Sequence, residues 1–364
     1  MGIPASAQKE DRVVFTSASQ DYCVRDVIDA AHFRGELDPF WNELLVRLAA
    51  ETLAHETEAE LDEAALDEAS IAFRYRYDLI TAEETEQWLD ARHVTLGDFS
   101  EYFAREQWAK AFRGKTNPEI IPLAEASSEQ RERLAVELTL TGELDRMATQ
   151  LAWRVAVCDN ERAAEVEHAW LEAERTGFAE RVGGGRDEVA AWLHGIGREA
   201  SWLEENLAME AAYRRQCEKL LTKEAREREV SALRLPLTRL DMEMIELESR
   251  NAANEAFLCV RDDGLSMEEV AAEGRYPYLR TELLLEELPI ELQQKFLSLS
   301  PGNVLEPTPR DDGYVLSRLL GKAEPKASDP EVQARIERRI LERYFSDLTA
   351  SRIQWRILLN PAEE

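Results

Sequence analysis

Cysteines are few in this sequence and basic residues are outnumbered by acidic ones, and both features exclude classes of protein. Cys23, Cys158, Cys217 and Cys259 stand far apart in 364 residues, and no two form a CxxC pair. Thiols scattered in this way are typical of reduced core residues rather than of a disulfide framework or a zinc site. Lys and Arg total 44 against 73 Asp and Glu, which gives a net charge of −29. Such a negative field disfavours binding to nucleic acid or to an anionic membrane surface.

Long apolar runs are also missing. No stretch of the sequence approaches the ~20 apolar residues that span a bilayer. Residues 1–25 lack the basic start and the apolar centre of a signal peptide. We therefore expect a cytoplasmic protein that does not insert into membranes, unless a separate system exports it.

Short motifs for metal, nucleotide or nucleophilic chemistry are absent from the sequence. The glycines at 183–185 precede a helical segment, but no strand comes before them and no P-loop lysine follows. There is no GxSxG element. We expect neither a cofactor nor a metal, while a catalytic triad assembled from distant residues stays open. No HExxH or HxxxH spacing occurs among His32, His55, His93, His168 and His194.

Most of residues 36–229 has the composition and spacing of helices. The segment is rich in Ala, Glu, Leu and Arg, and its apolar residues recur at intervals of three and four. Thr81 followed by Glu84 forms a capping box before a short helix that contains Trp88 and Leu89. Together with the mixed pattern after residue 230, this predicts a mainly α fold with a small α+β domain.

The helical half contains an internal duplication. The tetrapeptide GELD at 35–38 recurs at 142–145, and both copies predict a long helix, a second helix, a short helix with Trp-Leu and a final helix with aromatic residues. We predict two related helical modules, residues 1–120 and 121–232, joined by a linker with Pro118 and Pro122. At an offset of 104, Trp88, Leu89, Phe99 and Phe103 match Trp192, Leu193, Leu203 and Leu207.

Tryptophan is concentrated in these modules, with seven of the eight residues before position 230. At helical spacing, such residues usually pack in the core. A tryptophan that lines a groove for apolar peptide segments would give the same pattern. Trp88, Trp108 and Trp192 are therefore candidate peptide-binding residues.

After residue 230 the pattern changes to alternating strands and helices. The last helix, from Asp329 to about Thr349, leads to a strand at 353–357 that we expect to pair with residues 13–17. Residues 233–325 then form one domain, and residues 326–364 a helix and strand that return to the helical part. The other predicted elements are a strand at 237–249, helices at 251–264, 265–274 and 288–302, and a strand hairpin at 303–322.

This order resembles the parvulin type of peptidyl-prolyl isomerase, embedded as in SurA-type and PpiC-related chaperones. The resemblance is carried by IELESRNAANEAFLCVRDDGLSMEEVA (245–271) and LSPGNVLEPTPRDDGYVLSRL (299–319). Residues 79–108 resemble the SurA N-terminal domain, and the whole is similar to PpiC-related proteins of peptide maturation systems. It implies a SurA-N-like module, a second related module and a parvulin-like domain. The matching positions are Gly264, Val270, Ala271, Gly302, Pro307, Gly313, Tyr314 and Leu319.

The departures from the family pattern concern catalysis. Active parvulins carry a histidine in the opening strand and another in the closing strand, where this chain has Met244 and Val315. Residues 274–289 replace the family's glycine-rich stretch. Met244, Phe296 and Tyr314 would keep an apolar pocket for proline, but the polar network that twists the amide is missing.

The resemblance therefore implies a catalytically degenerate chaperone that binds an unfolded or precursor polypeptide for maturation or export. Two alternatives stay open. One is an active isomerase that works without the usual histidines. The other is a scaffold that docks a peptide-modifying enzyme through its acidic face. The expected partners are the client polypeptide and, in addition, a peptide-modifying enzyme or an exporter.

Overall fold

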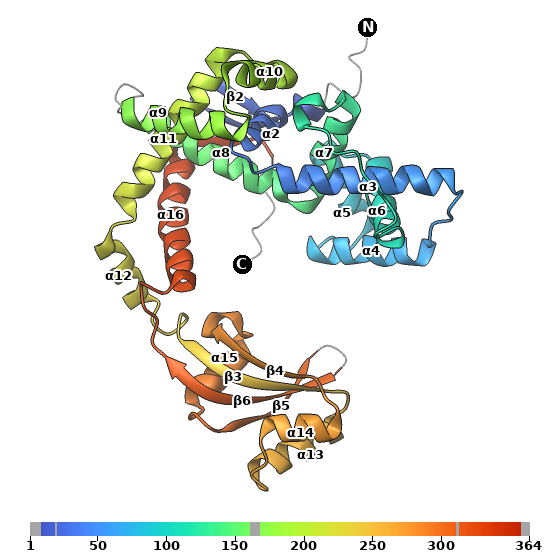
Figure 1. Cartoon of the computed structure of the whole chain (residues 1–364), viewed down its shortest axis with the longest axis vertical. Coiled ribbons are helices and arrows are strands. Elements are labelled where there is room, and N and C mark those ends of the chain that lie inside the picture. Colours follow the sequence, from blue (N-terminus) through green and yellow to red (C-terminus); the bar gives the residue numbers. More distant parts are fainter. Residues whose placement is uncertain (1–8, 19, 161–167, 311–312, 358–364) are drawn as a thin grey trace. The chain divides into compact units, whose positions relative to one another are not determined.

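The chain divides into two compact units (Figure 1). The structure is a computed structural model that describes residues 9–18, 20–160, 168–310 and 313–357. Unit 1 comprises Met1–Cys217 and Tyr344–Glu364, and unit 2 comprises Glu218–Arg343. Unit 1 is largely helical, whereas unit 2 contains a four-stranded sheet packed against helices. The predicted fold class, mainly α with a small α+β domain, is confirmed.

Unit 1 contains two successive sets of four helices in the same order. The first set is α3 (Asp38–Glu56), α4 (Glu63–Arg76), α5 (Ala82–Ala91) and α6 (Leu96–Ala111). The second set is α8 (Glu143–Asn160), α9 (His168–Arg181), α10 (Arg186–Ile196) and α11 (Ala200–Leu220). Unit 1 also contains α2 (Val24–Phe33) before the first set, and η1 (Leu123–Glu125) and α7 (Ser128–Thr141) between the sets.

Local side-chain contacts fix where helix α5 starts. Thr81 Oγ1 accepts a hydrogen bond from the backbone N–H of Glu84 (3.1 Å), and the Glu84 carboxylate accepts one from the N–H of Thr81 (2.7 Å). These bonds satisfy donors that the first turn of a helix leaves unpaired. The capping box predicted from the sequence is therefore confirmed.

Aligned positions of the two helix sets lie in two separate aromatic clusters. Phe73, Leu89, Phe99 and Phe103 form a buried cluster among α4, α5 and α6. The second cluster lies among α9, α10 and α11. The internal duplication stays a prediction, and so does the division of the chain into four parts. The members of this second cluster include Phe178, Leu193, Leu203 and Leu207.

A buried carboxylate on α2 links helix α7 to the segment between α10 and α11. Asp29 is 0% exposed, and its two oxygens lie 2.7 Å from the guanidinium groups of Arg131 on α7 and Arg198 after α10. A buried carboxylate is stable only where charged or polar groups compensate it, so Asp29 favours the arrangement that brings both arginines to it.

A three-stranded sheet brings distant parts of the sequence together. Its order is β2-β1-β7, with β1 (Val13–Ser17), β2 (Gln20–Cys23) and β7 (Ile353–Trp355). Phe15 pairs with Trp355 across β1 and β7, and their rings meet edge to face at 5.4 Å. The predicted pairing of the terminal strand with residues 13–17 is confirmed.

Unit 2 contains the strands and helices predicted between residues 237 and 322, the first part of the long helix predicted after them, and one further strand. The sheet order is β4-β3-β6-β5, with every neighbouring pair antiparallel. The strands are β3 (Arg239–Leu247), β4 (Tyr278–Leu284), β5 (Val304–Arg310) and β6 (Gly313–Ala323), and β4 was not predicted. The helical elements are α12 (Lys223–Ala232), α13 (Arg250–Arg261), α14 (Met267–Gly274), η3 (Leu285–Glu287), α15 (Ile290–Ser298) and α16 (Pro330–Arg352), which continues into unit 1.

Helices cover both faces of this sheet. On one face, Ile245, Leu247 and Leu316 pack against buried residues of α13 and α14. On the other face, Leu240 and Met242 of β3 pack against Phe296 of α15. The two sets alternate along β3, as expected for a strand buried on both sides.

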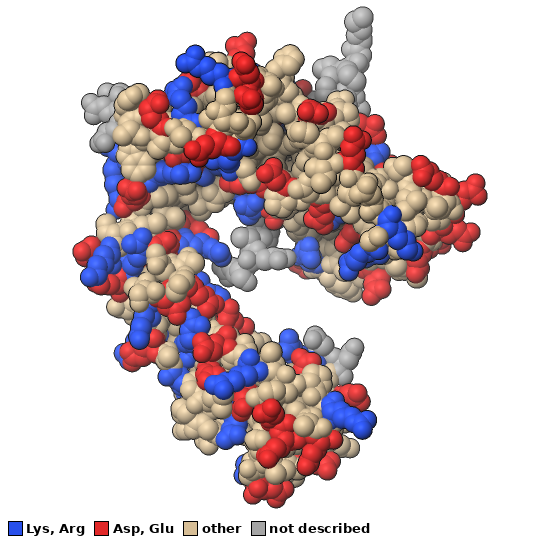
Figure 2. All heavy atoms as spheres, viewed as in Figure 1, with Lys and Arg blue, Asp and Glu red and all other residues tan. Residues whose placement is uncertain are grey.

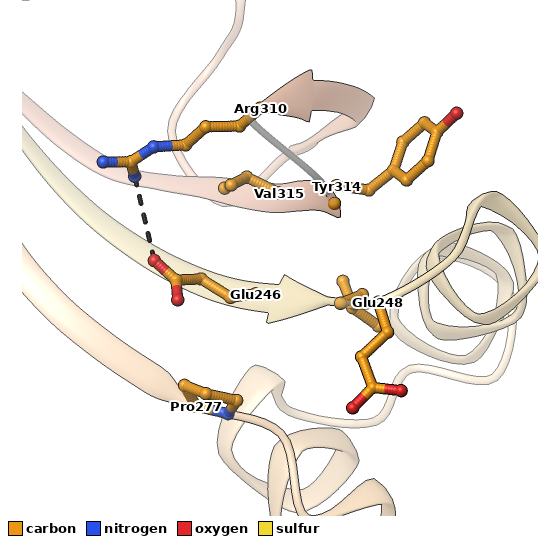
Figure 3. A pocket seen from close by; sticks show the side chains of 8 residues that line it. Glu246, Glu248, Pro277, Arg310, Tyr314 and Val315 are labelled. Atoms are coloured by element: carbon orange, nitrogen blue, oxygen red, sulfur yellow. Dashed lines mark ion pairs between the residues drawn. The ribbon is translucent and has the colours of Figure 1, made fainter. Parts of the chain in front are cut away.

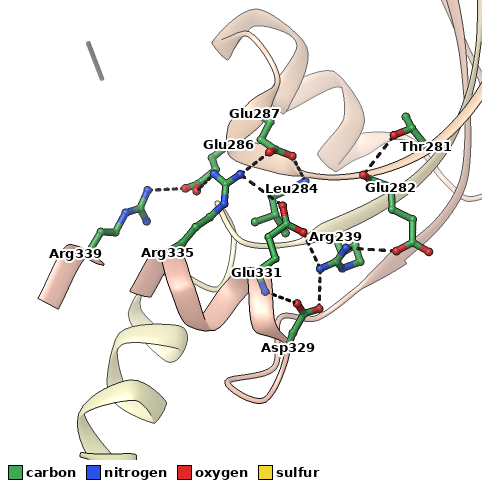
Figure 4. A network of polar contacts seen from close by, with 10 residues as sticks. All are labelled: Arg239, Thr281, Glu282, Leu284, Glu286, Glu287, Asp329, Glu331, Arg335 and Arg339. Atoms are coloured by element: carbon green, nitrogen blue, oxygen red, sulfur yellow. Dashed lines mark hydrogen bonds and ion pairs between the residues drawn. The ribbon is translucent and has the colours of Figure 1, made fainter. Parts of the chain in front are cut away.

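Ion pairs attach the first turns of α16 to the sheet (Figure 4). Arg239 of β3 lies 2.7 Å from Asp329, just before α16. Arg335 and Arg339 of α16 both reach Glu286 of η3, at 2.8 and 2.6 Å. Val332 and Ile336 are buried beneath this network against Leu237 and Leu284. The N-terminal part of α16 is thus an integral part of unit 2.

We predict that Gly313→Ala destabilises unit 2 while Gly321→Ala, on the same strand, does not. A Cβ at Gly313 would lie 2.7 Å from the carbonyl oxygen of Leu247, whereas one at Gly321 would meet only the Cβ of Asp241 at an ordinary 3.9 Å. Forcing the backbone apart at Gly313 should cost about 1–3 kcal/mol of unfolding free energy. Urea unfolding of both variants checks this, and equal stability of the two would contradict it.

Candidate functional site

Strand register places the two histidine-replacing residues on one face of the sheet in unit 2. Met244 pairs with Ser317, and Glu246 pairs with Val315. Since side chains alternate along a strand, all four of these side chains project from the same face. Val315 is therefore a diagonal neighbour of Met244. A thioether and an isopropyl group occupy the two positions where the family resemblance would place imidazoles.

A row of four side chains, one from each strand, crosses the sheet through Met244. Leu279 of β4 pairs with Met244 of β3, Met244 pairs with Ser317 of β6, and Ser317 pairs with Leu305 of β5. We call Leu279, Met244, Ser317 and Leu305 the transverse row. Leu279 is 54% exposed, Met244 and Leu305 are half-buried, and Ser317 is buried. The row is an apolar strip with one hydroxyl near its centre.

Helix α15 covers the face beside the transverse row. Phe296 of α15 is 1% exposed and packs with Leu240, Met242 and Leu319. Met244 lies at the margin of this cluster. Phe296 therefore supports the transverse row from within the core, and Met244 is the member of the predicted pair that a ligand would touch.

Tyr314 lies on the opposite face. It pairs with Leu247, and its ring packs against the core formed with α13 and α14. In Figure 3 the ring points away from Glu246 and Arg310. The structure thus brings Met244 and Phe296 together but separates Tyr314 from them.

A shallow pocket of about 430 Å³ lies at the end of β3, beside the transverse row (Figure 3). Glu246, Pro277, Arg310 and Val315 are among its lining residues, and so is Tyr314, the predicted site residue next to Val315 in the chain. The Glu246 carboxylate lies 3.8 Å from the Arg310 guanidinium, and both side chains are well exposed. The candidate site therefore has an apolar centre and a rim with charges of both signs.

The candidate site has no histidine. All five histidines of the sequence precede residue 218, so unit 2 contains none. On the opposite face, burial and a hydrogen bond to Glu243 (2.8 Å) raise the pKa of Tyr278 to about 12. The site can enclose apolar groups and donate a hydrogen bond from Ser317, but it offers no imidazole to exchange a proton.

The three candidate tryptophans lie in separate environments of unit 1. Trp88 packs in the cluster of α4 to α6, with the Arg92 guanidinium 4.0 Å above its ring. Trp108 lies 5.3 Å from the His55 ring, and within the described residues its buried Nε1 has no hydrogen-bond partner. Trp192 packs with Phe178 of the second cluster. They do not form one surface.

Trp192 also lines a groove of about 500 Å³ beside the segment that joins the helix sets. His32 lies across from it, with 5.0 Å between the ring centroids. The Trp41 indole donates a hydrogen bond to the backbone oxygen of Ile121 (2.7 Å), which holds one wall of the groove. Of the three tryptophans, Trp192 is thus the one placed at a recess.

Burial lowers the pKa of His32 to about 4; the Asp38 carboxylate opposes this shift, and the charge of Arg131 adds to it. Its buried Nδ1 has no hydrogen-bond partner among the residues that the structure describes. The neutral ring suits this site, because protonation would place a charge and an unsatisfied N–H in the groove wall.

Within 9–18, 20–160, 168–310 and 313–357, no group of three or more His, Cys, Asp or Glu side chains is placed to hold a metal ion. Every helix in these ranges is too short or too polar to cross a membrane.

Sequence reasoning missed three members of the transverse row: Leu279, Ser317 and Leu305. Leu279 was missed because β4 was not foreseen. The alternation of Leu279, Thr281 and Leu283 with Arg280 and Glu282 was nevertheless a usable strand signal. Ser317 and Leu305 depend on pairing register, which their own sequence does not specify.

Comparisons with known proteins found similarity among solved structures. No family model matches the chain, and no curated protein matches it. The chain is similar to the peptidylprolyl isomerase PrsA of Bacillus anthracis (16% identity, 56% of this chain and 94% of that one, TM-score 0.32). It is also similar to PrsA of Bacillus cereus (14%, 60% and 85%, TM-score 0.36). A third is a SurA-like chaperone structure from Campylobacter jejuni (8%, 61% and 87%, TM-score 0.20).

We predict that His32 makes the stability of unit 1 depend on pH. Its folded pKa of about 4 lies below the unfolded value near 6.5, so the contribution is complete above pH 6.5 and is lost as the pH falls toward 4. Between pH 7 and pH 5 the wild type should lose about 1–2 kcal/mol more than His32→Phe, which keeps a ring against Trp192. Urea unfolding at both pH values measures the difference, and parallel losses would contradict the prediction.

Proposed function

We propose that this chain is a chaperone-like peptide-binding protein of the SurA/parvulin type with a degenerate isomerase site. It would hold an unfolded or precursor polypeptide for maturation or export. The observation that carries the proposal is the transverse row, because it retains an apolar binding surface at the place where the family resemblance expects catalytic histidines.

The chemistry of the row favours holding over catalysis. Burying one Leu- or Met-sized side chain contributes about 1.5–3 kcal/mol, so two or three client side chains can give weak, reversible binding. Accelerating prolyl isomerisation about 10⁵-fold would require ~7 kcal/mol of stabilisation specific to the twisted amide. Leu279, Met244 and Leu305 offer burial to any apolar segment, and the Ser317 hydroxyl is the polar group available in the row.

The acidic surface supports a preference for basic clients. Figure 2 shows acidic side chains gathered around the turn between α3 and α4. From Glu51 to Glu68 the sequence has eight acidic residues and no Lys or Arg, and most of these side chains are exposed. A field of this sign attracts cationic segments and weakens as salt screens it. We therefore propose electrostatic steering of clients, with apolar capture at the transverse row.

We also propose a cytoplasmic site of action, in which the four cysteines stay reduced. All four lie within the described residues, where they are half-buried and form no disulfide. A peptide-modifying enzyme or an exporter would then be a second partner that receives the client.

We expect the full chain to slow the aggregation of an unfolded protein at substoichiometric ratios without accelerating prolyl isomerisation. Light scattering of a denatured client measures the first effect, and a protease-coupled prolyl peptide assay measures the second. A rate well above the uncatalysed background would favour the active-isomerase alternative. No effect on aggregation would reject the holding function.

A matched pair of variants locates the client site. Met244→Gln preserves side-chain length but places an amide in the transverse row, so client capture should fall several-fold. Leu258→Gln makes the same kind of change at an exposed leucine of α13, on the other face of the sheet, and should leave capture unchanged. Fluorescence anisotropy of a labelled apolar peptide compares the two, and equal affinities would remove the row from the site.

A further inference from the structure

The two edges of the sheet in unit 2 differ in their capacity to accept another strand. β5 forms one edge and contains Pro307 and Pro309, which have no N–H to donate. β4 forms the other edge and has no proline between Tyr278 and Leu284. Proline is one of the residues that blunt natural edge strands, so a seven-residue edge without proline stays open to pairing with another strand.

The register identifies which backbone groups of β4 face outward. The N–H of Glu246 donates to the oxygen of Pro277 (3.1 Å), and the N–H of Leu285 donates to the oxygen of Thr238 (2.9 Å). Residues that bond to β3 alternate with residues that face away from it. Pro277 and Leu285 both bond to β3, so the odd-numbered residues between them do so as well. The residues of β4 that face outward are therefore Tyr278, Arg280, Glu282 and Leu284. Glu287 already accepts a hydrogen bond from the N–H of Leu284 (2.7 Å).

The sequence of this edge is complementary to itself. The segment is Leu279-Arg280-Thr281-Glu282-Leu283. When it is read in the opposite direction, Arg280 and Glu282 exchange places and a leucine again stands at each end. A two-fold axis beside Thr281 would set Arg280 directly opposite Glu282 of a second copy. Both residues present their N–H and C=O outward, so they would exchange two hydrogen bonds, as an antiparallel pair does.

The charges within one copy are incompletely matched. Glu282 lies directly opposite Asp241 of β3, a like charge, and its carboxylate is 3.4 Å from the Arg239 guanidinium (Figure 4). Arg280 is 63% exposed, although it reaches Asp241 at 3.0 Å. Like charges directly opposite each other destabilise a sheet, and opposite charges stabilise it. Arg280 of a second copy would give Glu282 the directly opposed base that β3 does not provide.

The apolar side of the edge has the same symmetry. Leu279 is 54% exposed and would lie opposite Leu283 of the second copy. Both side chains share the face of the transverse row, so the pairing would join two rows across one continuous face. We propose that two copies of this chain associate through β4, in antiparallel register about Thr281, to form an eight-stranded sheet.

Complementary charge reversal of the full-length chain tests the proposal. Sedimentation velocity from low micromolar to submillimolar concentration, at moderate ionic strength, should show a reversible dimer of the wild type. Arg280→Glu alone sets a second carboxylate opposite Glu282 at two symmetric places, and Glu282→Arg alone sets two guanidinium groups opposite each other. Each variant should dissociate roughly tenfold more readily.

Mixing the two variants is the decisive step. A chain with Arg280→Glu and a chain with Glu282→Arg present opposite charges to each other at both places, so the equimolar mixture should recover the wild-type dimer. Arg261→Glu on α13 makes the same charge change away from the edge and should leave the dimer intact. Thermal unfolding of each variant establishes that it is folded.

Three outcomes would overturn the proposal. They are a wild type that is monomeric throughout, a dimer that tolerates both single reversals, and a mixture that fails to recover. A monomeric wild type whose client capture is lost in Glu282→Pro would assign the edge to an added client strand instead. The proline removes only an outward N–H, so pairing with β3 should persist.

Discussion

The antiparallel register of β3 between β4 and β6 is the constraint on which the arrangement of unit 2 depends. Because side chains alternate along a strand, one register decides which residues meet α13 and α14 and which meet α15. It also sets Met244 beside Val315 and separates both from Tyr314. A shift by one residue would bury Glu243 and expose Ile245, so hydrophobic burial on both faces holds the register in place.

Much of unit 2 could be predicted because its signals are local. Turn residues and alternation located the main helices and every strand of this unit except β4, and the order of these elements carried the family resemblance. Local signals were not enough to predict which side chains share a face with Met244. Phe296 does, and Tyr314 does not. Tyr314 and Val315 are neighbours in the chain and must point to opposite faces, so only one of them can share a face with Met244. Which one depends on pairing with a strand about seventy residues away in sequence.

In unit 1 the sequence could not predict which distant charged residues pair with each other. Arg47 and Arg154 occupy matching positions of the proposed duplication, and each is buried against a carboxylate and beside a tyrosine ring. Arg47 pairs with Glu137 (2.6 Å) on α7, while Arg154 pairs with Glu210 (2.5 Å) on α11. The sequence indicates two equivalent arginines but not that their partners come from different helices. The composition, rich in both charges, offers too many partners for spacing alone to select one.

The pairing of β1 with β7 has a consequence for how the protein is made. The ribosome delivers β1 long before β7, so the small sheet of unit 1 cannot close until all of unit 2 has been synthesised. Closing so long a loop is entropically unfavourable and slow, and it competes with the folding of unit 2 in the intervening chain. During that interval Val14 and Phe15, which end fully buried, lack the final strand that covers them. The small sheet of unit 1 is therefore completed only after β7 has been synthesised, which makes this pairing a late step in the folding of the chain.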